Sequence, residues 1–347
     1  KLGGSVKGKS VLVLCGKGNN GGDGAALARI LWTMGADITL VLFGNVEETR
    51  GNARTNFEIC RNDGSYNFYE FKTRDDWEKW YWNSRFDFDV IVDAIFGTGL
   101  QRPLEVWLWN IVHHLNIINE HPRPKRLIVS VDIPSGVNAD LSQLIGENFQ
   151  ADLTITFTAP KLANVFPPAS NFNGELYVAN IGSPQELIDN CPSKLFVTEK
   201  TDAQEWIRET KVKPNSYKKT RGTALIIAGS ENYSGAAVLA ANACFSAGAG
   251  MVTVAVPKEI RPIVAGKVSS ELIVQTIDNI DVNCDVIGMG CGMSPDKQTH
   301  EFIRETVLNR KTSMVLDAQA LNAFSALSEC FSEGFPLVFT PHDGEFK

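Results

Sequence analysis

Short runs of aliphatic and β-branched residues alternate along this chain with stretches of helical character. This alternation is typical of parallel strands with helices on both faces of a sheet. The runs predict seven strands in the first half of the chain: Ser10–Gly16, Asp37–Phe43, Phe68–Phe71, Val90–Phe96, Leu127–Ile133, Leu153–Thr158 and Leu176–Ile181. They predict six more in the second half: Ala224–Ala228, Val252–Val256, Leu272–Gln275, Val286–Met289, Met314–Leu316 and Leu337–Thr340. Helices are predicted near Asp23–Met34, Glu47–Arg61, Asp76–Trp82 and Leu104–Asn119.

A polar segment with two prolines, GSPQELIDNCPSK at 182–194, separates the two series of strands. We therefore expect two α/β domains, at residues 1–190 and 200–347. The uncharged stretch Ser234–Pro257 is long enough to suggest a membrane span. Because glycines at 248 and 250 interrupt it, we expect a helix, a turn and a strand, and no membrane partner.

Composition narrows the class of protein. The 347 residues include 33 Lys and Arg against 40 Asp and Glu, a formal net charge of −7, which argues against a nucleic-acid partner. The seven cysteines are scattered, without a C-x-x-C pair. They predict reduced thiols in a cytoplasmic protein and favour neither a disulfide framework nor a zinc site.

The strongest local motif is VLVLCGKGNNGGDG, a strand that enters a glycine-rich turn ahead of a helix. Gly16, Gly18 and Gly21 match the dinucleotide fingerprint G-x-G-x-x-G, so an NAD-dependent oxidoreductase is one hypothesis. That function requires an acidic residue after the second strand, and none occurs there before Glu47. The fingerprint also leaves Asn19, Asn20 and Asp23 unexplained.

Two further apolar strands end in acidic residues. Asp93 precedes a glycine-rich loop in VDAIFGTGL, and Asp132 precedes Pro134 and Ser135 in VDIPSG. A single aspartate at a strand end is commonly only a helix cap or a turn residue. Three polar clusters at one edge of a sheet instead suggest a site. Amide, carboxylate and hydroxyl oxygens suit an alkali or alkaline-earth cation better than zinc.

In this order and spacing, GNNGGDG, VDAIFGTGL and VDIPSG resemble the NAD(P)H-hydrate epimerase domain, over roughly residues 5–185. The resemblance implies a Rossmann-like three-layer fold that interconverts the R and S epimers of hydrated NADH and NADPH at C6 of the nicotinamide ring. It implies a potassium ion bound by Asn20, Asp93 and Ser135, and Asp132 against the nicotinamide ring. Because a carboxylate within hydrogen-bond reach can carry the proton of the C6 hydroxyl, our hypothesis is that Asp132 is the acid/base. The implied contacts to the hydrate are Asn19, Asn20, Gly21, Gly22, Asp23, Gly97, Thr98, Gly99, Leu100, Gln101, Arg102, Pro103 and Asp132.

The second half resembles the ADP/ATP-dependent NAD(P)H-hydrate dehydratase domain, which has a ribokinase-like fold. The resemblance rests on the Gly/Ser turn and Ala-rich helix after Ala228 and on DVIGMGCGM, VLDAQALN and TPHDGEF. It implies that Ala236, Gly290 and His342 contact the hydrate, and that ADP or ATP is the cofactor. This sequence has Asp317-Ala318-Gln319 where the family usually has DAD, and Pro341-His342-Asp343 where it usually has PHP.

The chain starts without Met and stops just after a strand, so we expect both ends to be incomplete. The family's nucleotide-binding and catalytic-acid motifs lie downstream of the final motif, so we expect these 347 residues alone not to dehydrate the hydrate. The family resemblance also implies a homo-oligomer. A binding module on the same fold without catalysis is the remaining alternative, and the presence of Asn20, Asp93 and Asp132 argues against it.

Overall fold

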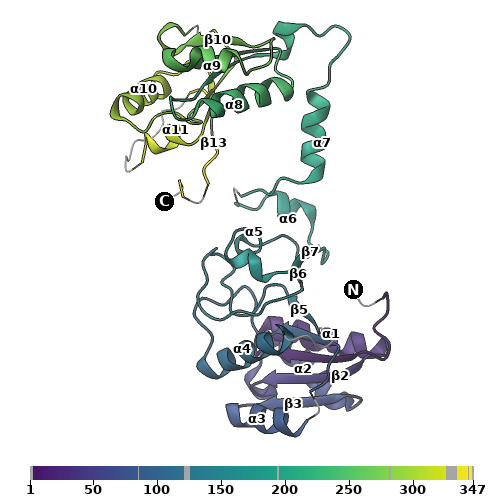
Figure 1. Cartoon of the computed structure of the whole chain (residues 1–347). Helices are drawn as coiled ribbons and strands as arrows, with labels where there is room; N and C mark the ends of the chain where they lie inside the picture. The colour runs from purple at the N-terminus through teal and green to yellow at the C-terminus, as the bar shows by residue number, and fades with distance from the viewer. Residues whose placement is uncertain are drawn as a thin grey trace. The chain divides into compact units, whose positions relative to one another are not determined.

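The apolar runs of the chain form two separate parallel sheets, as the computed structural model shows (Figure 1). The structure describes residues 3–84, 86–120, 126–193, 195–280, 283–325, 334–342 and 344–345. The chain divides into two units, residues 1–193 and 194–347. Each unit is an α/β layer structure, which confirms the predicted fold class.

The first unit contains seven parallel strands in the order β3-β2-β1-β4-β5-β6-β7. The strands are β1 Ser10–Cys15, β2 Asp37–Phe43, β3 Asn67–Phe71, β4 Val90–Ala94, β5 Leu127–Val131, β6 Leu153–Phe157 and β7 Glu175–Ala179. The helices are α1 Asn19–Thr33, α2 Gly51–Asp63, α3 Arg74–Asn83, α4 Val106–Glu120, α5 Leu162–Val165 and α6 Gln185–Asp189.

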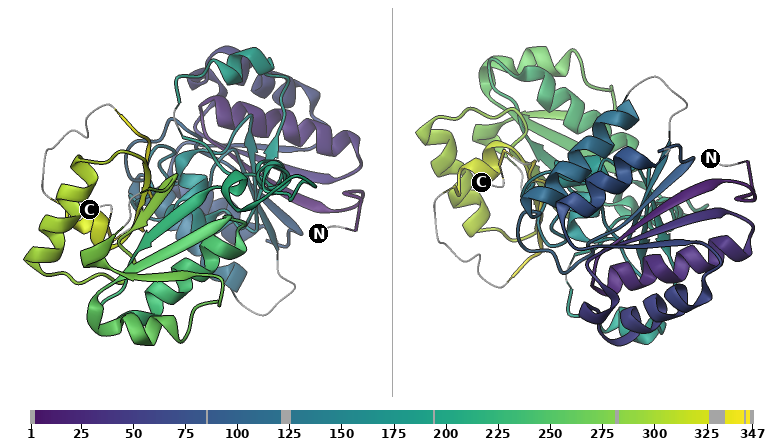
Figure 2. Two further views of the ribbon diagram at one scale, coloured as in Figure 1. Left: turned by 90° about the horizontal axis from the view of Figure 1, so that it is seen from above. Right: turned by 90° about the horizontal axis from the view of Figure 1, so that it is seen from below.

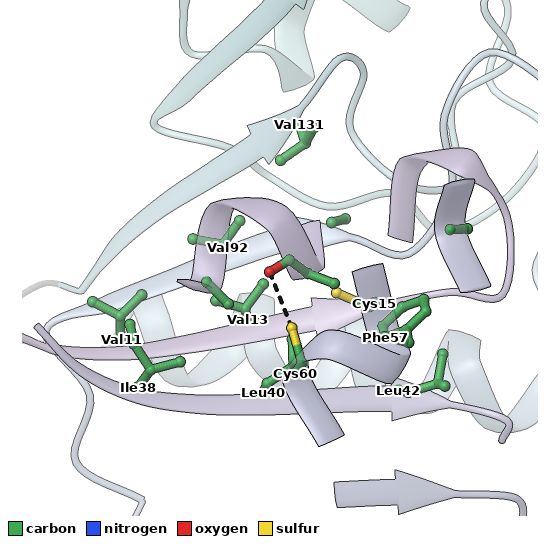
Figure 3. Packing of buried hydrophobic residues seen from close by; sticks show 14 of the residues in the cluster. Val11, Val13, Cys15, Ile38, Leu40, Leu42, Phe57, Cys60, Val92 and Val131 are labelled. Carbon is green, nitrogen blue, oxygen red and sulfur yellow. Dashed lines mark hydrogen bonds between the residues drawn. The ribbon is translucent and has the colours of Figure 1, made fainter. Parts of the chain in front are cut away.

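Helices cover both faces of this sheet (Figure 2). On one face, Ala25 of α1 and Phe57 of α2 pack on alternate residues of β1 and β2, in the buried cluster of Figure 3. On the other face, Trp77 of α3 and Leu115 of α4 pack on the intervening residues. Strands buried on both faces read as continuous apolar runs, which is why the sequence reveals them.

Helix α1 begins four residues earlier than the sequence predicts, at Asn19 instead of Asp23. Its glycines explain the difference, since each lies against a neighbour that leaves no room for a side chain. A Cβ on Gly21 would stand 1.8 Å from the carbonyl oxygen of Gly16, and one on Gly22 would stand 2.6 Å from Cα of Ala53. These glycines therefore permit close packing of α1 on the preceding turn and on α2, and do not form a flexible turn.

The second unit repeats the same arrangement with six parallel strands in the order β10-β9-β8-β11-β12-β13. The strands are β8 Thr223–Ile227, β9 Met251–Val256, β10 Ile273–Thr276, β11 Val286–Met289, β12 Ser313–Leu316 and β13 Leu337–Phe339. The helices are α7 Lys200–Glu209, α8 Ser234–Ser246, α9 Arg261–Ala265, α10 Lys297–Leu308 and α11 Gln319–Asn322. Residues of α8 and α9 share one buried cluster, and residues of α10 and α11 share the other.

Two other predictions about local structure have clear outcomes. The uncharged stretch at 234–257 forms α8, a turn and β9, as expected. Helix α2 begins at Gly51, not at Glu47, because Val46–Glu48 forms a separate short turn capped by Asn45. Within the described residues, no helix is long and apolar enough to cross a bilayer.

Candidate functional site

The strand order of the first sheet reverses between β1 and β4, and open α/β sheets bind ligands at the carboxyl ends of the strands at such a point. The two strand ends approach closely here, since the amide of Gly16 donates to the carbonyl of Ala94 (3.1 Å). A Cβ on Gly16 would stand 2.0 Å from the carbonyl oxygen of Ile95. A cavity of about 710 Å³ lies at this edge, bounded by the start of α1, the 95–105 loop and Asp132.

Asp93 is buried beneath this edge, with no exposed surface. Its carboxylate accepts hydrogen bonds from the Ser135 hydroxyl (2.5 Å), the Ser135 amide (2.7 Å), the Ser130 hydroxyl (2.9 Å) and the Ile95 amide (3.3 Å). All these donors are neutral. Burial raises the pKa of Asp93 to about 6, although the hydrogen bonds from the serines act in the opposite direction.

A short chain of hydrogen bonds connects Asp93 to the cavity. The Phe96 amide donates to the Ser135 hydroxyl (2.8 Å), and the Asn20 side-chain amide donates to the Phe96 carbonyl (2.9 Å). The three residues that the sequence suggested as cation ligands, Asn20, Asp93 and Ser135, therefore lie in one connected cluster. Every group offered to a cation there is an oxygen, and the buried carboxylate has no ion-pair partner among the described residues, so the cluster fits a hard monovalent or divalent cation.

Asp132 directly follows β5 and adopts φ = 68°, a left-handed backbone conformation that residues other than glycine seldom take. One carboxylate oxygen, Oδ1, accepts hydrogen bonds from the Thr156 hydroxyl (3.0 Å) and the Phe157 amide (3.3 Å). The same oxygen forms an ion pair with Nζ of Lys161 at 2.5 Å. The residue also lines the cavity. Strained backbone of this kind is concentrated at functional sites.

Lys161, the cationic partner of Asp132, is a residue that the sequence did not suggest. Its ammonium group also donates to the Thr156 hydroxyl (2.7 Å) and the Phe157 carbonyl (3.1 Å). A signal was available, because Lys161 follows the end of a predicted strand in TFTAPK, as Asp93 and Asp132 do.

Asp23, in the second turn of α1, is another carboxylate residue that lines the cavity, as Glu48 and Glu105 also do. Partial burial raises the pKa of Asp23 above its ordinary value of 3.8, and the charge of Asp132 raises it further. The two carboxylates therefore affect each other electrostatically across the site.

The cavity collects most of the hydrate contacts predicted in the first unit. Those that line it are Asn19, Asn20, Asp23, Gly97, Thr98, Gly99, Leu100, Arg102, Pro103 and Asp132. Three predicted contacts do not line the cavity: Gly21 and Gly22, which are buried within α1, and Gln101, which is exposed. Lys17, Lys72 and Trp107 also line the cavity, and the sequence had not suggested them.

In the second unit the strand order reverses between β8 and β11. The Gly229 amide donates to the Cys291 carbonyl across this point (2.9 Å). Gly290 is buried at φ = 123°, and a Cβ there would stand 1.8 Å from the carbonyl oxygen of Asp317. Ala236 lies against Gly292, and a Cβ added to Gly292 would stand 2.5 Å from the Cβ of Ala236.

The third predicted contact of this unit, His342, is exposed beyond β13 and hydrogen-bonds within its own turn to Gly344 and Glu345. Asp317 connects the neighbouring loops, because it accepts hydrogen bonds from the Cys291 thiol (3.2 Å) and the Thr340 hydroxyl (2.9 Å). The carboxyl ends of β8, β11, β12 and β13 are thus connected, as a ligand site at this edge requires.

Comparison with known proteins identifies both units. Residues 1–163 match the family described as YjeF-related protein N-terminus, and residues 224–347 match the family described as NAD(P)H-hydrate dehydratase.

Similar full-length proteins match across both units. The chain is 35% identical to the bifunctional NAD(P)H-hydrate repair enzyme of Moorella thermoacetica, a match that covers 99% of this chain and 66% of that one. It is 31% identical to the enzyme of the same name from Salinibacter ruber, over 99% of this chain and 67% of the relative. It is 33% identical to the enzyme of the same name from Thermofilum pendens, over 97% of this chain and 65% of the relative. The chain thus spans about two thirds of the length of these relatives.

Among solved structures, an ADP/ATP-dependent NAD(P)H-hydrate dehydratase from Bacillus subtilis, co-crystallised with ATP and Mg²⁺, is 27% identical. That match covers 41% of this chain and 53% of the other, with a TM-score of 0.36.

Proposed function

The chain belongs to the family of bifunctional NAD(P)H-hydrate repair enzymes, and we propose that its first unit interconverts the R and S epimers of hydrated NADH and NADPH at C6 of the nicotinamide ring. The observation that carries this proposal is the Asp132 carboxylate. One of its oxygens is held by Lys161 and Thr156, and the residue lines a cavity of about 710 Å³. A carboxylate fixed in this way can exchange a proton with a bound substrate.

The chemistry needs only a proton that moves between substrate and protein. C6 of the hydrate carries a hydroxyl and is bonded to the ring nitrogen. Asp132 takes up a proton from solvent and delivers it to that hydroxyl. The C6–O bond then breaks, water leaves, and the nitrogen lone pair forms an iminium. Water then adds to the other face of C6 and returns its extra proton to the carboxylate. We assign both proton transfers to Asp132.

The loop at 97–103 and the residues Asn19, Asn20 and Asp23 are proposed to hold the hydrate, because they surround the same cavity. We further propose a potassium ion at Asn20, Asp93 and Ser135. The ion would supply a fixed positive charge beside the buried carboxylate and the substrate phosphates. Its support is the all-oxygen cluster around a buried carboxylate whose described hydrogen-bond donors are all neutral.

The proposal is tested by incubating the chain with the purified R-hydrate of NADH. A separate S-specific dehydratase reports the S epimer as it forms, in potassium chloride and in choline chloride at equal ionic strength. We expect conversion that is faster in potassium. A rate equal to the uncatalysed background in both salts would overturn the assignment of epimerase activity. Equal catalysed rates in both salts would overturn the role of potassium alone.

An NAD-dependent oxidoreductase is the second candidate that the glycine fingerprint allows. It requires a free acidic side chain after β2 to bind the ribose. The first acids there are Glu47, which pairs with Arg61 (2.8 Å), and Glu48, which pairs with Lys17 (2.9 Å). Both carboxylates are therefore engaged by cations, which favours the epimerase.

For the second unit we propose a part in the dehydration of the S-hydrate, with ADP or ATP as cofactor. The support is its membership of the dehydratase family together with the connected strand ends around Gly290 and Asp317. ADP-dependent recovery of NADH from the S-hydrate, followed at the absorbance of the reduced ring, tests this part. If a protein that contains this chain and has the length of its relatives recovers no NADH, the proposed dehydration is overturned.

We also propose that the protein acts in the cytoplasm and assembles with copies of itself. The cytoplasmic location is supported by the free thiols of five described cysteines, Cys15, Cys60, Cys191, Cys244 and Cys291. Analytical ultracentrifugation tests the assembly, and a sedimentation coefficient of a monomer at micromolar concentration would contradict it.

A further inference from the structure

Lys161 lies between β6 and α5, and its side chain reaches the end of the neighbouring strand β5. The ammonium group has three described acceptors: Oδ1 of Asp132 (2.5 Å), the Thr156 hydroxyl (2.7 Å) and the Phe157 carbonyl (3.1 Å). The side chains of Lys161 and Asp132 are only 20% and 14% exposed, so solvent screens this pair less than a surface salt bridge.

The Asp132 carboxylate is held asymmetrically. Oδ1 accepts from Thr156, Phe157 and Lys161, whereas no donor among the described residues contacts Oδ2. A carboxylate with one fully occupied oxygen has a defined rotamer and presents the other oxygen to a ligand.

The charges around Asp132 make the ammonium group important. Asp23 of α1 faces the same cavity and interacts electrostatically with Asp132, and Asp93 lies at the end of the adjacent strand β4. Lys161 supplies the described ion pair to Asp132. Without it, three carboxylates would share this edge of the sheet with no compensating cation in contact with Asp132, and their repulsion favours rotation of Asp132 towards solvent.

The loop that carries Lys161 does not depend on the ammonium group for its own structure. The Lys161 amide donates to the Asn164 side chain (2.8 Å), and Asn164 in turn hydrogen-bonds to Asn173 (3.0 Å). The Ala163 amide donates to the Ala139 carbonyl (3.1 Å). Because these bonds hold the backbone, loss of the ammonium group should leave the loop in place.

We propose that Lys161 is a positioning residue for epimerisation: its ammonium group occupies Oδ1 of Asp132 and so directs Oδ2 to the C6 hydroxyl of the hydrate. This inference rests on the epimerase activity proposed above and adds a residue to it. Lys161 itself takes no part in the proton transfer.

The test compares the variants Lys161→Met and Lys161→Arg with the wild-type chain. In the epimerisation assay we expect Lys161→Met to lower kcat by about 10- to 100-fold, as misplacement of a reacting group does. We expect KM to change by less than about threefold, because substrate contacts in the cavity are retained. Lys161→Arg keeps the charge and donors and should recover much of kcat.

A matched control is available in Lys9→Met. Lys9 pairs with Asp89 at 3.0 Å, so this variant also breaks a lysine–aspartate pair of the first sheet, at its opposite edge. It should leave kcat unchanged. A raised KM with unchanged kcat in Lys161→Met would overturn the inference by showing a substrate-binding role. An equal loss in Lys161→Met and Lys161→Arg would also overturn it.

A crystal structure of Lys161→Met separates this inference from the proposed function. We expect the Asp132 carboxylate to rotate away from its wild-type position while β5 and β6 keep theirs. An unmoved carboxylate would overturn the positioning role, whatever the activity. If the wild-type chain does not epimerise the hydrate, the proposed function fails, and the same structure still decides whether Lys161 positions Asp132.

Discussion

Two aspartates at adjacent strand ends share one sequence pattern but lie in different environments. Asp93 at the end of β4 is fully buried, and its donors among the described residues, chiefly Ser135 and Ser130, are neutral. Asp132 after β5 borders the cavity and is paired with a cation, Lys161. Their sequences, an apolar strand followed by aspartate and a glycine- or proline-containing turn, do not distinguish them.

The difference teaches that the donors around a carboxylate decide its role. Burial raises the pKa of Asp93 to about 6, although the neutral donors around it act in the opposite direction, so a bound cation would further stabilise its negative charge. A cationic partner, Lys161, holds the carboxyl group of Asp132 in place beside the proposed substrate site. We therefore assign electrostatic support to Asp93 and proton transfer to Asp132, and the following variants test that division.

Asp132→Asn should have the largest effect. We expect epimerisation to fall by about 10²- to 10⁴-fold, the usual contribution of an acid/base group. The fold should persist, because asparagine tolerates a positive φ and keeps an oxygen that accepts from Thr156. Turnover of the R-hydrate and the melting temperature measure the two effects. Asp140→Asn, an exposed position on the same loop, is the control. Wild-type turnover in Asp132→Asn would remove Asp132 from the mechanism.

Gly21→Ala tests the scaffold that brings both aspartates to one edge. The new Cβ would stand 1.8 Å from the carbonyl oxygen of Gly16, so the start of α1 must shift. We expect a loss of about 1–3 kcal/mol in the free energy of unfolding, as overpacking produces. Gly18→Ala is the matched control, because a Cβ there meets nothing within 4 Å. Equal denaturation midpoints in urea for the two variants would contradict the packing role of Gly21.

Asp93→Asn tests the proposed cation site. In the wild type, potassium at tenfold its Kd should stabilise the fold by about 1.4 kcal/mol, and the variant should lose this gain. Because burial raises the pKa of Asp93 to about 6, the folded state binds a proton more tightly than the unfolded one. The cost of the buried charge thus appears as the pH rises from 3.8 towards 6. The benefit from potassium should be present above pH 6 and shrink below it.

Melting temperatures in potassium chloride and choline chloride, at pH 7.5 and pH 5, provide the measurement. The same potassium gain in Asp93→Asn as in the wild type would show that the ion binds elsewhere.

The sequence reveals the central strands well because strands such as β1, β2 and β4 are buried on both faces and are therefore almost continuously apolar. It places the ends of several strands too late, because the loops after them begin with buried apolar residues. Ile95 and Ile133, which follow β4 and β5, are only 2% and 1% exposed. The start of α1 was misplaced because glycines normally indicate a turn, whereas here they permit contact between backbones.

The polar residues at the strand ends were predictable as a group, because carboxyl ends of parallel strands meet at one edge. The pairing of Asp132 with Lys161 was not. It depends on a long side chain that crosses from the loop after β6 to the end of β5, and no periodicity in the sequence encodes that direction. The different burial of Asp93 and Asp132 was hidden for the same reason.

Asp23→Asn should have the smallest effect, and it is an effect on stability. It extends the comparison of Asp93 and Asp132 to a third carboxylate. Partial burial and the charge of Asp132 raise the pKa of Asp23, so ionisation of Asp23 opposes folding once the pH exceeds its ordinary 3.8. The variant should therefore be slightly more stable than the wild type at pH 7, by less than about 1 kcal/mol because solvent screens an exposed group. The gain should disappear as the pH approaches 3.8. Urea denaturation at pH 7 and pH 4 tests this, and a loss of stability at pH 7 would mean that Asp23 forms favourable contacts that outweigh its repulsion from Asp132.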